Sequence, residues 1–145
     1  MADATTLLGQ GFADGEAGGP VLHLTEPLNA WGGLDPRTGL LIHRQHPQRG
    51  ANVAGTVLVL LETRGSGTNA QVLAETWRNR LGPAAVVLGR PDSVLMAGVI
   101  VARDLYGIKC PVAVLDPESL ARFRDVATAH VLVRGTTATI TLSPE

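Results

Sequence analysis

The sequence predicts a single α/β domain built on a central parallel sheet, with a β-rich N-terminal part. Between residues 55 and 127, apolar runs alternate with helical patterns, and such successive β-α pairs favour a parallel sheet. Seventeen glycines and nine prolines, against 3% aromatic residues, indicate many short elements joined by tight turns. The 145 residues are 45% hydrophobic, which suits one compact domain with a real core.

The two ends of the chain have sequence patterns typical of β-structure. Residues 8–50 carry turn signals every few positions, and short strands fit between them at 21–24 and 39–42. The closing segment, 130–142, alternates around Gly135 and is expected to pair with the opening strands. The expected boundaries are 8–142 for the domain, with 1–7 and 143–145 as flexible termini.

The middle of the chain contains three apolar runs, and a helical pattern follows each of them. The expected strands cover residues 56–61, 84–88 and 112–115. The expected helices are 69–81, a second within 93–106, and a short third after Pro117. The first helix repeats its apolar residues at the spacing of one buried face, formed by Ala70, Leu73, Ala74, Trp77 and Leu81.

A glycine-rich turn joins the first of these strands to its helix. Thr68 and Gln71 have the spacing of a reciprocal capping box, which gives Thr68 a structural role. Ser66 lies in the turn itself, where Gly65 and Gly67 on either side allow the backbone to approach a ligand closely. A helix start brings free backbone N–H groups, and the arginine before the turn adds a positive charge. We therefore expect an acidic ligand here.

Three chemistries use a turn of this kind. A Walker phosphate loop requires a Gly-Lys pair, which the sequence lacks, so it is excluded. Residues 65–70 formally match the dinucleotide fingerprint, but that turn normally follows the first strand of a doubly wound sheet. No clear ribose-binding acid lies about 20 residues downstream either. The third is acid–base chemistry by Ser66, with Arg64 and the helix N–H groups stabilising an alkoxide or binding a carboxylate. The alternative, that Ser66 is a turn residue without a chemical role, stays open.

Composition limits the partners and the compartment. A formal net charge of −1 without a long Lys/Arg run argues against nucleic acid and anionic membrane surfaces. The N-terminus lacks the cationic segment and apolar core of a signal peptide, and no apolar run approaches the roughly 18 residues that span a bilayer. We expect a cytoplasmic protein. Its single cysteine, Cys110, is expected to be a buried, inert thiol that cannot hold an iron–sulfur cluster by itself.

The histidines are weaker candidates than the glycine turn. His43 and His46, with Asp35, suggest a metal site, but a His-x-x-His pair in a turn region without a third fixed ligand is generic. Exposed or capping histidines are the favoured interpretation. His23 suggests a phosphocarrier histidine, but it lies inside an alternating strand without a helix start beside it, which favours a strand-packing role. Trp31 is more typical of an interface or core anchor than of a ligand contact.

A series of motifs resembles the small subunit of the aconitase X family. They are, in chain order, Gly32-Gly33-Leu34-Asp35-Pro36-x-Thr38-Gly39, His46-Pro47, Gly55-x-Val57-Leu58-Val59, Arg64-Gly65-Ser66, Pro83-Ala84-Ala85-Val86-Val87 and Ala97-Gly98-x-Ile100-Val101-Ala102. The resemblance covers roughly residues 8–118, and the ordered series is much more specific than any one motif. It implies a swivelling β/β/α domain, the counterpart of the mobile small domain of aconitase.

The resemblance also implies an activity. The family dehydrates hydroxy acids, so this chain is expected to be the small subunit of a heteromeric hydro-lyase. Ser66 matches the serine base that the swivel domain supplies from a glycine-serine turn. The substrate-binding residues implied with it are Arg64, Gly65, Gly67, Thr68, Gly32, Gly33 and Asp35. The backbone N–H groups of the turn share the negative charge, and Arg64 stabilises the alkoxide or holds the substrate carboxylate.

The cofactor and partner follow from the same resemblance. An iron–sulfur cluster or iron is expected on a large, Cys-rich partner subunit, and none is expected on this chain alone. Archaeal members carry Gly-Lys-Gly-Ser at the turn, whereas this chain has Thr63-Arg64-Gly65-Ser66, which favours cis-3-hydroxy-L-proline over mevalonate 5-phosphate as substrate. Phosphomevalonate dehydration stays open, as does a non-catalytic ligand-binding or phosphocarrier domain.

Overall fold

The computed structural model of the chain describes residues 5–144. The elements of this part, in chain order, are the strands β1 (Thr5–Ala13), β2 (Gly15–His23) and β3 (Val57–Leu60), the helix α1 (Thr68–Arg78), the strand β4 (Ala85–Leu88), the helix α2 (Ser93–Tyr106), the strand β5 (Val112–Val114), the 3-10 helix η1 (Pro117–Phe123), and the strands β6 (Thr128–Arg134) and β7 (Thr137–Ser143). None of the helices that the structure describes is long and apolar enough to cross a membrane.

The strands form a closed barrel in the order β1-β5-β4-β3-β2-β6-β7. β2, β3, β4 and β5 run parallel to one another. The β-α pattern predicted this for β3, β4 and β5 only. The pairs β1-β5, β1-β7, β2-β6 and β6-β7 are antiparallel. The expected parallel central sheet is therefore corrected to a mixed barrel. The closing hairpin explains the difference, because β6 and β7 turn back within two residues at Gly135, and a tight turn allows only antiparallel pairing.

The N-terminal strand β1 was not among the strands expected from the sequence. β1 begins at Thr5, which pairs with Leu142 of β7, so the predicted boundary at residue 8 lies three residues too late. Residues 1–4 and 145 of the expected flexible termini lie outside the described residues. The prediction that the closing segment pairs with the opening strands is confirmed, since β6 pairs with β2 and β7 with β1.

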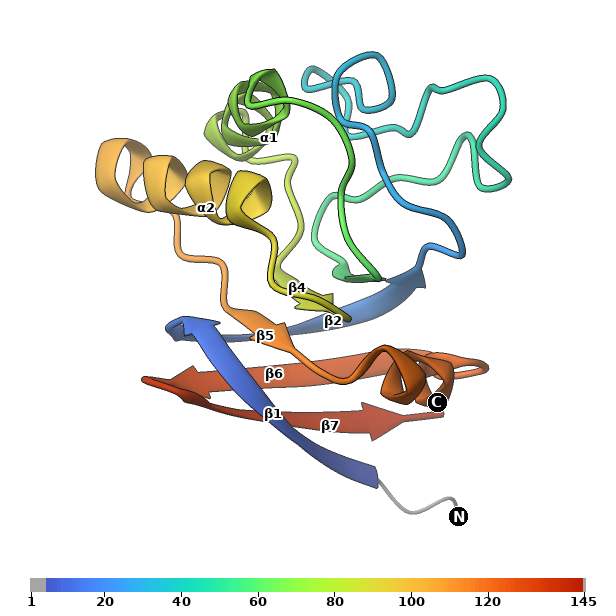
Figure 1. The fold of residues 1–145 in the computed structure, drawn as a ribbon, viewed down its shortest axis with the longest axis vertical. Coiled ribbons are helices and arrows are strands. Elements are labelled where there is room, and N and C mark those ends of the chain that lie inside the picture. Colours follow the sequence, from blue (N-terminus) through green and yellow to red (C-terminus); the bar gives the residue numbers. More distant parts are fainter. Residues whose placement is uncertain (1–4, 145) are drawn as a thin grey trace.

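Residues 24–56 form one extended connection without a named strand, which we call the long loop. The strand expected at 39–42 is wrong. Its residues take part only in isolated bridges, Leu34 with Leu41 and Leu40 with Asn52. The long loop lies on the same side of the barrel as the helices (Figure 1). It contributes apolar anchors to the core there, namely Leu24, Leu28, Ala30, Leu34, Leu41 and Val53.

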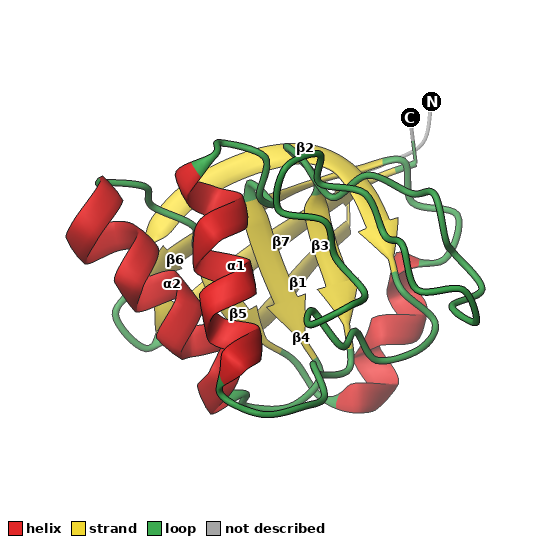
Figure 2. Cartoon of the chain, turned by 90° about the horizontal axis from the view of Figure 1, so that it is seen from above, coloured by secondary structure: helices red, strands yellow, loops and turns green. Residues whose placement is uncertain are grey.

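Two apolar clusters lie on either side of the parallel strands. One face of β3, β4 and β5 packs under α1 and α2, with Leu58 and Leu60 meeting Leu73, Trp77 and Leu95. The other face fills the barrel together with side chains of β6, β7 and η1. Both faces of these three strands are buried, which is why they read as continuous apolar runs. Seen from above, the two helices cross over the strands (Figure 2).

The predicted helices and buried thiol are found, but one cap is different. α2 has the expected bounds. α1 begins at Thr68, and its N-cap residue is Gly67, so no side chain caps this helix. The capping box between Thr68 and Gln71 is therefore wrong, because Thr68 is already the first helical residue. Cys110 is 2% exposed, and burial raises the pKa of its thiol, as expected of an inert cysteine.

Candidate functional site

The glycine turn, residues 64–67, begins at the carboxyl end of β3 and is fixed there by a carboxylate from another segment. Asp92 Oδ2 accepts hydrogen bonds from the Thr63 N–H at 2.7 Å and from the Thr63 hydroxyl at 2.6 Å. Its Oδ1 accepts from the N–H groups of Val94 and Leu95 and so caps α2. One side chain therefore joins the entry of the turn to the start of α2.

A buried amide fixes the other side of the turn. Asn69 is 1% exposed, and its Nδ2 donates to the Arg64 carbonyl at 2.8 Å while its Oδ1 accepts from the Trp31 N–H at 2.6 Å. The Arg64 N–H donates to the Leu28 carbonyl at 2.9 Å. The turn is thus held between α1 and the long loop by bonds that leave no buried polar group of Asn69 unpaired.

Gly65 is the position in the turn that requires glycine. Its φ is +120°, and a Cβ built on it would lie 1.9 Å from Asn69 Nδ2 and 3.1 Å from Asn29 Oδ1. A side chain there would displace the amide that holds the turn. Gly67 differs, because its φ is −58° and nothing lies within 4 Å of a Cβ built on it. Gly67 therefore leaves open space next to Ser66.

Ser66 is exposed, with its side chain directed back to the helix start. Its Oγ accepts a long hydrogen bond of 3.4 Å from the Thr68 N–H. The guanidinium of Arg64, two residues before it, forms none of the ion pairs or side-chain hydrogen bonds of the described residues. An accessible hydroxyl, an N–H donor and an unpaired cation are therefore within one turn of backbone, the set that stabilises an alkoxide or an anionic ligand.

The expected second half of the site, in residues 32–35, has mainly structural contacts. The backbone N–H of Arg37 bonds Asp35 Oδ1 at 2.9 Å, which is the largest cause of a lowered pKa for that carboxyl. Gly33 is buried, and a Cβ on it would lie 2.1 Å from the Asn29 carbonyl oxygen. Gly32 and Asp35 line a hollow beside α1 that also contains Trp31. The bond from the Trp31 N–H to Asn69 Oδ1 joins residues that neighbour this segment and the glycine turn.

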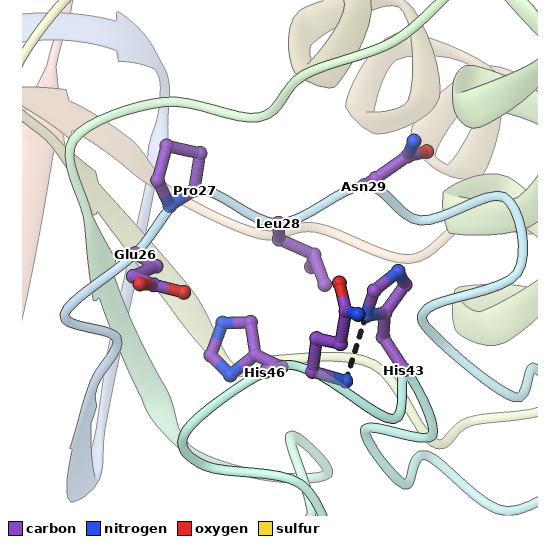
Figure 3. A pocket seen from close by; sticks show the side chains of 7 residues that line it. Glu26, Pro27, Leu28, Asn29, His43 and His46 are labelled. Atoms are coloured by element: carbon purple, nitrogen blue, oxygen red, sulfur yellow. Dashed lines mark hydrogen bonds between the residues drawn. The ribbon is translucent and has the colours of Figure 1, made fainter.

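A pocket of about 330 Å³ lies beside the glycine turn, between residues 26–29 and 43–46 of the long loop (Figure 3). We call it the 26–46 pocket. Its lining residues are Glu26, Pro27, Leu28, Asn29, His43, Gln45 and His46. Asn29 and Leu28 connect it to the turn, through the approach of Asn29 Oδ1 to Gly65 and the bond from Arg64 to the Leu28 carbonyl. Two residues of the pocket wall, Leu28 and Asn29, therefore lie against the glycine turn.

The histidines of this pocket cap turns, as the sequence favoured. His43 Nδ1 accepts from the Gln45 N–H at 3.2 Å, and His46 Nδ1 accepts from the Gln48 N–H at 3.0 Å. In the described residues, no three His, Cys, Asp or Glu side chains are arranged to hold a metal ion.

His23, at the end of β2, packs edge-on against Phe123 with the ring centroids 6.4 Å apart. Burial, and secondly the charge of Arg124, lowers the pKa of its imidazole. This contact is that of a packing histidine, as the alternating strand predicted. The ring lies in a hollow lined by residues of η1 and by Leu61.

Sequence reasoning missed Asp92, Asn69 and the lining of the 26–46 pocket. Asp92 had a readable signal, because an Asp directly before a helical pattern is a preferred N-cap. Asn69 had none, since a buried asparagine is recognised only through its partners in distant segments. The pocket joins two stretches of the long loop whose approach no periodicity predicts.

Comparison with known proteins identifies relatives along nearly the whole chain. Residues 6–142 match the family model described as the aconitase X swivel domain. A cis-3-hydroxy-L-proline dehydratase of Pseudomonas aeruginosa is 37% identical over 115 residues, 79% of this chain and 20% of that protein. A phosphomevalonate dehydratase small subunit of Methanothermobacter thermautotrophicus is 36% identical over 88 residues, 61% of this chain and 67% of that one. The chain thus spans about a fifth of the hydroxyproline dehydratase.

A solved structure has the same fold. The crystal structure of Thermococcus kodakaraensis aconitase X, in its holo-form, aligns with a TM-score of 0.77 at 24% identity. The alignment covers 94% of this chain and 98% of that chain. The mixed barrel with its two covering helices is therefore an arrangement already known among solved proteins.

Proposed function

The chain belongs to the aconitase X swivel-domain family, as its motifs predicted, and on that premise we propose that it is the small subunit of a two-subunit hydroxy-acid dehydratase. The observation that carries the proposal is the glycine turn. There, Ser66 is accessible, the guanidinium of Arg64 has no partner among the described residues, and Asn69 and Asp92 hold the backbone in place. Relatives named as dehydratases and as a small subunit support it.

In this proposal Ser66 is the base. As an alkoxide it takes the proton from the carbon beside the substrate carboxylate, and the C–O bond on the next carbon breaks with its electron pair as the double bond forms. The departing hydroxide gains one proton to become water, and Ser66 gives up the proton that it took to return to the alkoxide, so that one water leaves overall. The Thr68 N–H, which already points at Ser66 Oγ, stabilises the alkoxide. Arg64 presents a planar fork of donors that fits a carboxylate. The fixed backbone of the turn keeps these groups in place, so little reorganisation is needed during proton transfer.

The leaving hydroxyl needs a separate electrophile. We place an iron or iron–sulfur centre on a large partner subunit, where it would supply the affinity for that oxygen. The residues of this chain contribute the base and the carboxylate contacts. The active site would then form where the two subunits meet, with the glycine turn facing the partner.

Within this activity we favour cis-3-hydroxy-L-proline as the substrate. The Arg64-Gly65-Ser66 turn departs from the Gly-Lys-Gly-Ser of archaeal phosphomevalonate dehydratases, and the 35–37% identical relatives from Pseudomonas aeruginosa and Hypocrea jecorina are named as dehydratases of this compound. Mevalonate 5-phosphate is the alternative, supported by the small-subunit relatives.

Co-expression with a large aconitase X-type subunit tests the proposal. We expect tagged chain to retain the large subunit and the assembled pair to dehydrate cis-3-hydroxy-L-proline, measured by formation of the unsaturated product. If the pair dehydrates mevalonate 5-phosphate and not cis-3-hydroxy-L-proline, mevalonate 5-phosphate becomes the assigned substrate. Failure to retain any large subunit, or an assembled pair inactive on both compounds, would favour a non-catalytic ligand-binding or phosphocarrier domain instead.

A further inference from the structure

Two large apolar side chains are exposed together beside α1, where the proposed mechanism does not use them. Trp31 is 66% exposed and Ile42 is 43% exposed. They line one hollow of about 460 Å³ together with Leu34, Pro36 and Val72, and we call it the Trp31 hollow. Isolated exposed apolar residues are common on protein surfaces. A tryptophan and an isoleucine that share one hollow instead form a patch typical of a protein–protein interface.

The backbone fixes the tryptophan in its exposed position. The Trp31 N–H donates to Asn69 Oδ1 at 2.6 Å, and Asn69 is itself buried. The N–H groups of Gly33 and Leu34 both donate to the Ala30 carbonyl, at 3.2 Å and 3.0 Å, and so close a tight turn around Trp31. A tryptophan side chain has only two torsions. Its presentation from a fixed turn therefore leaves little conformational entropy to be lost on binding.

The Trp31 hollow reaches the helix that starts at the glycine turn. Val72, in its wall, lies four residues after Thr68, the first residue of α1. Residues four apart in an α-helix lie on one face, about one turn from each other. Trp31 is joined to the same helix through Asn69, whose Nδ2 donates to the Arg64 carbonyl. A partner that covers the glycine turn can therefore cover the hollow as well.

We propose that the Trp31 hollow is an apolar anchor point for the large subunit, which places an apolar side chain in it against the Trp31 ring. Two exposed side chains do not supply the roughly 800 Å² that each partner buries in a stable interface, so the occupant must also cover the surface around them. That surface includes the start of α1 and its glycine turn. In the Pseudomonas aeruginosa relative the matched segment is 20% of the protein, so a domain of this kind belongs there to a much longer chain.

A second copy of this chain is a poorer occupant. A symmetric dimer uses the same patch on both copies, so it would cover the glycine turn of each copy and close both sites. The edge of the hollow is polar, because Asp35 and Arg37 form an ion pair at 3.5 Å and the Arg37 side chain is 85% exposed. The large subunit is therefore expected to surround its apolar side chain with polar groups, as in an interface with an apolar core and a polar rim. This inference rests on the proposed function and names the surface that binds its partner.

Fluorine NMR of the full chain labelled with 5-fluorotryptophan tests the inference. The chain has two tryptophans, and Trp77 is only 2% exposed. In the free chain, the Trp31 resonance is expected to shift when H₂O is replaced by D₂O, while the Trp77 resonance stays in place. Trp31→Phe assigns the two signals. When the unlabelled large aconitase X-type subunit is added, we expect the Trp31 resonance to shift and to lose its solvent dependence.

Substitutions measure how much the hollow contributes to affinity. We expect Trp31→Ala to weaken binding of the large subunit by about 30-fold in isothermal titration calorimetry, because a tryptophan buried at the centre of an interface is a typical hot spot. Ile42→Ala is expected to weaken it by about 5-fold. Leu105→Ala, at a side chain 70% exposed outside the hollow, is the matched control and should not change the affinity. All three side chains are exposed, so the urea midpoint of each variant should match that of the unsubstituted chain.

The inference is overturned if the Trp31 resonance keeps its solvent dependence in the assembled pair, or if Trp31→Ala binds the large subunit as tightly as Leu105→Ala does. A Trp31 resonance that shifts with the concentration of this chain alone would overturn it in favour of a second copy.

Failure of the proposed function gives a different result. Trp31-dependent assembly of a pair that dehydrates neither cis-3-hydroxy-L-proline nor mevalonate 5-phosphate would refute the activity and leave the interface standing. Turnover by a pair whose affinity does not depend on Trp31 would refute the interface alone. If the unsubstituted chain binds no large subunit, both are refuted.

Discussion

The barrel and the long loop are held together by different forces. The barrel interior is filled with apolar side chains such as Val57, Val131 and Ile140, all 0% exposed. The long loop has apolar anchors too, but polar side chains set its path. The side chain of Gln48, for example, donates from Nε2 to the His23 carbonyl at 2.6 Å and accepts at Oε1 from the Thr25 N–H at 2.8 Å. Substitutions in the barrel should therefore reduce stability, whereas substitutions at the loop and its glycine turn should alter site geometry.

The largest effect is expected from the hydroxyl of the glycine turn. Ser66→Ala removes the proposed base and should lower kcat of the assembled enzyme by about 10²–10⁴-fold, because proton transfer loses its acceptor. The exposed side chain has only the long bond to Thr68, so the free energy of unfolding should change by less than about 0.5 kcal/mol. Steady-state kinetics and denaturant unfolding measure the two quantities. Near-normal turnover by this variant would exclude Ser66 as the base.

A substitution in the barrel should have the opposite effect: it should lower stability and leave activity unchanged. Ile140→Ala in β7 leaves a cavity among fully buried side chains and should lower the free energy of unfolding by about 2–5 kcal/mol. Activity per folded molecule should stay unchanged, since Ile140 packs in the barrel cluster, which contains no residue of the glycine turn. Leu8→Ala, at a side chain 75% exposed, is the control and should be close to neutral. Loss of activity without loss of stability in Ile140→Ala would contradict this contrast between the barrel, which determines stability, and the long loop, which determines site geometry.

Gly65→Ala tests the geometry of the turn. A Cβ there would meet Asn69 Nδ2 at 1.9 Å, so the amide must move and the bonds to Arg64 and Trp31 weaken. A displacement of this size should lower kcat/KM by about 100-fold. Gly67→Ala, where φ is −58° and the space is open, is the stability control and should leave unfolding within about 0.5 kcal/mol. Full activity in Gly65→Ala would show that the turn tolerates a shifted Asn69.

The smallest effect concerns pH at the junction of the two regions. Burial, and then Arg124, lowers the pKa of His23 below its ordinary 6.5. The unfolded chain therefore binds this proton at a higher pH than the folded chain does, so the contribution of His23 is present above pH 6.5 and is lost as the pH falls below it. His23→Gln should flatten the fall in unfolding free energy between about pH 7 and about pH 5. An unchanged slope in His23→Gln would remove His23 from the cause.

The sequence revealed those parts of the fold that apolar side chains determine. α2 was predicted with its bounds, and β3, β4 and β5 were found because strands buried on both faces appear as continuous apolar runs. β1 was missed because its residues, apart from the buried Ala13 at its end, alternate between half-buried and exposed without a clear apolar face. The mixed pairing of the barrel depends on where distant strands meet, which local periodicity does not contain.

The candidate site also has one part that the sequence predicted and another that it did not. The glycine turn was predictable, since a Gly-Ser-Gly sequence between an apolar run and a helix has few structural interpretations. The role of Asn69 was not, because it depends on Trp31 and Arg64 meeting one buried amide. Glu26 was hidden for the same reason, since it joins His43 and His46 in one pocket only after the long loop has folded back on itself.

Closure of the barrel limits how another protein can recognise this domain. Each of the seven described strands is hydrogen-bonded to a neighbour on both sides, so none offers a free ladder of backbone groups. A partner cannot extend the sheet by adding a strand, and copies of the domain cannot aggregate edge to edge through it. Recognition must therefore depend on side chains. Partner choice can change by surface substitution while the backbone scaffold stays the same.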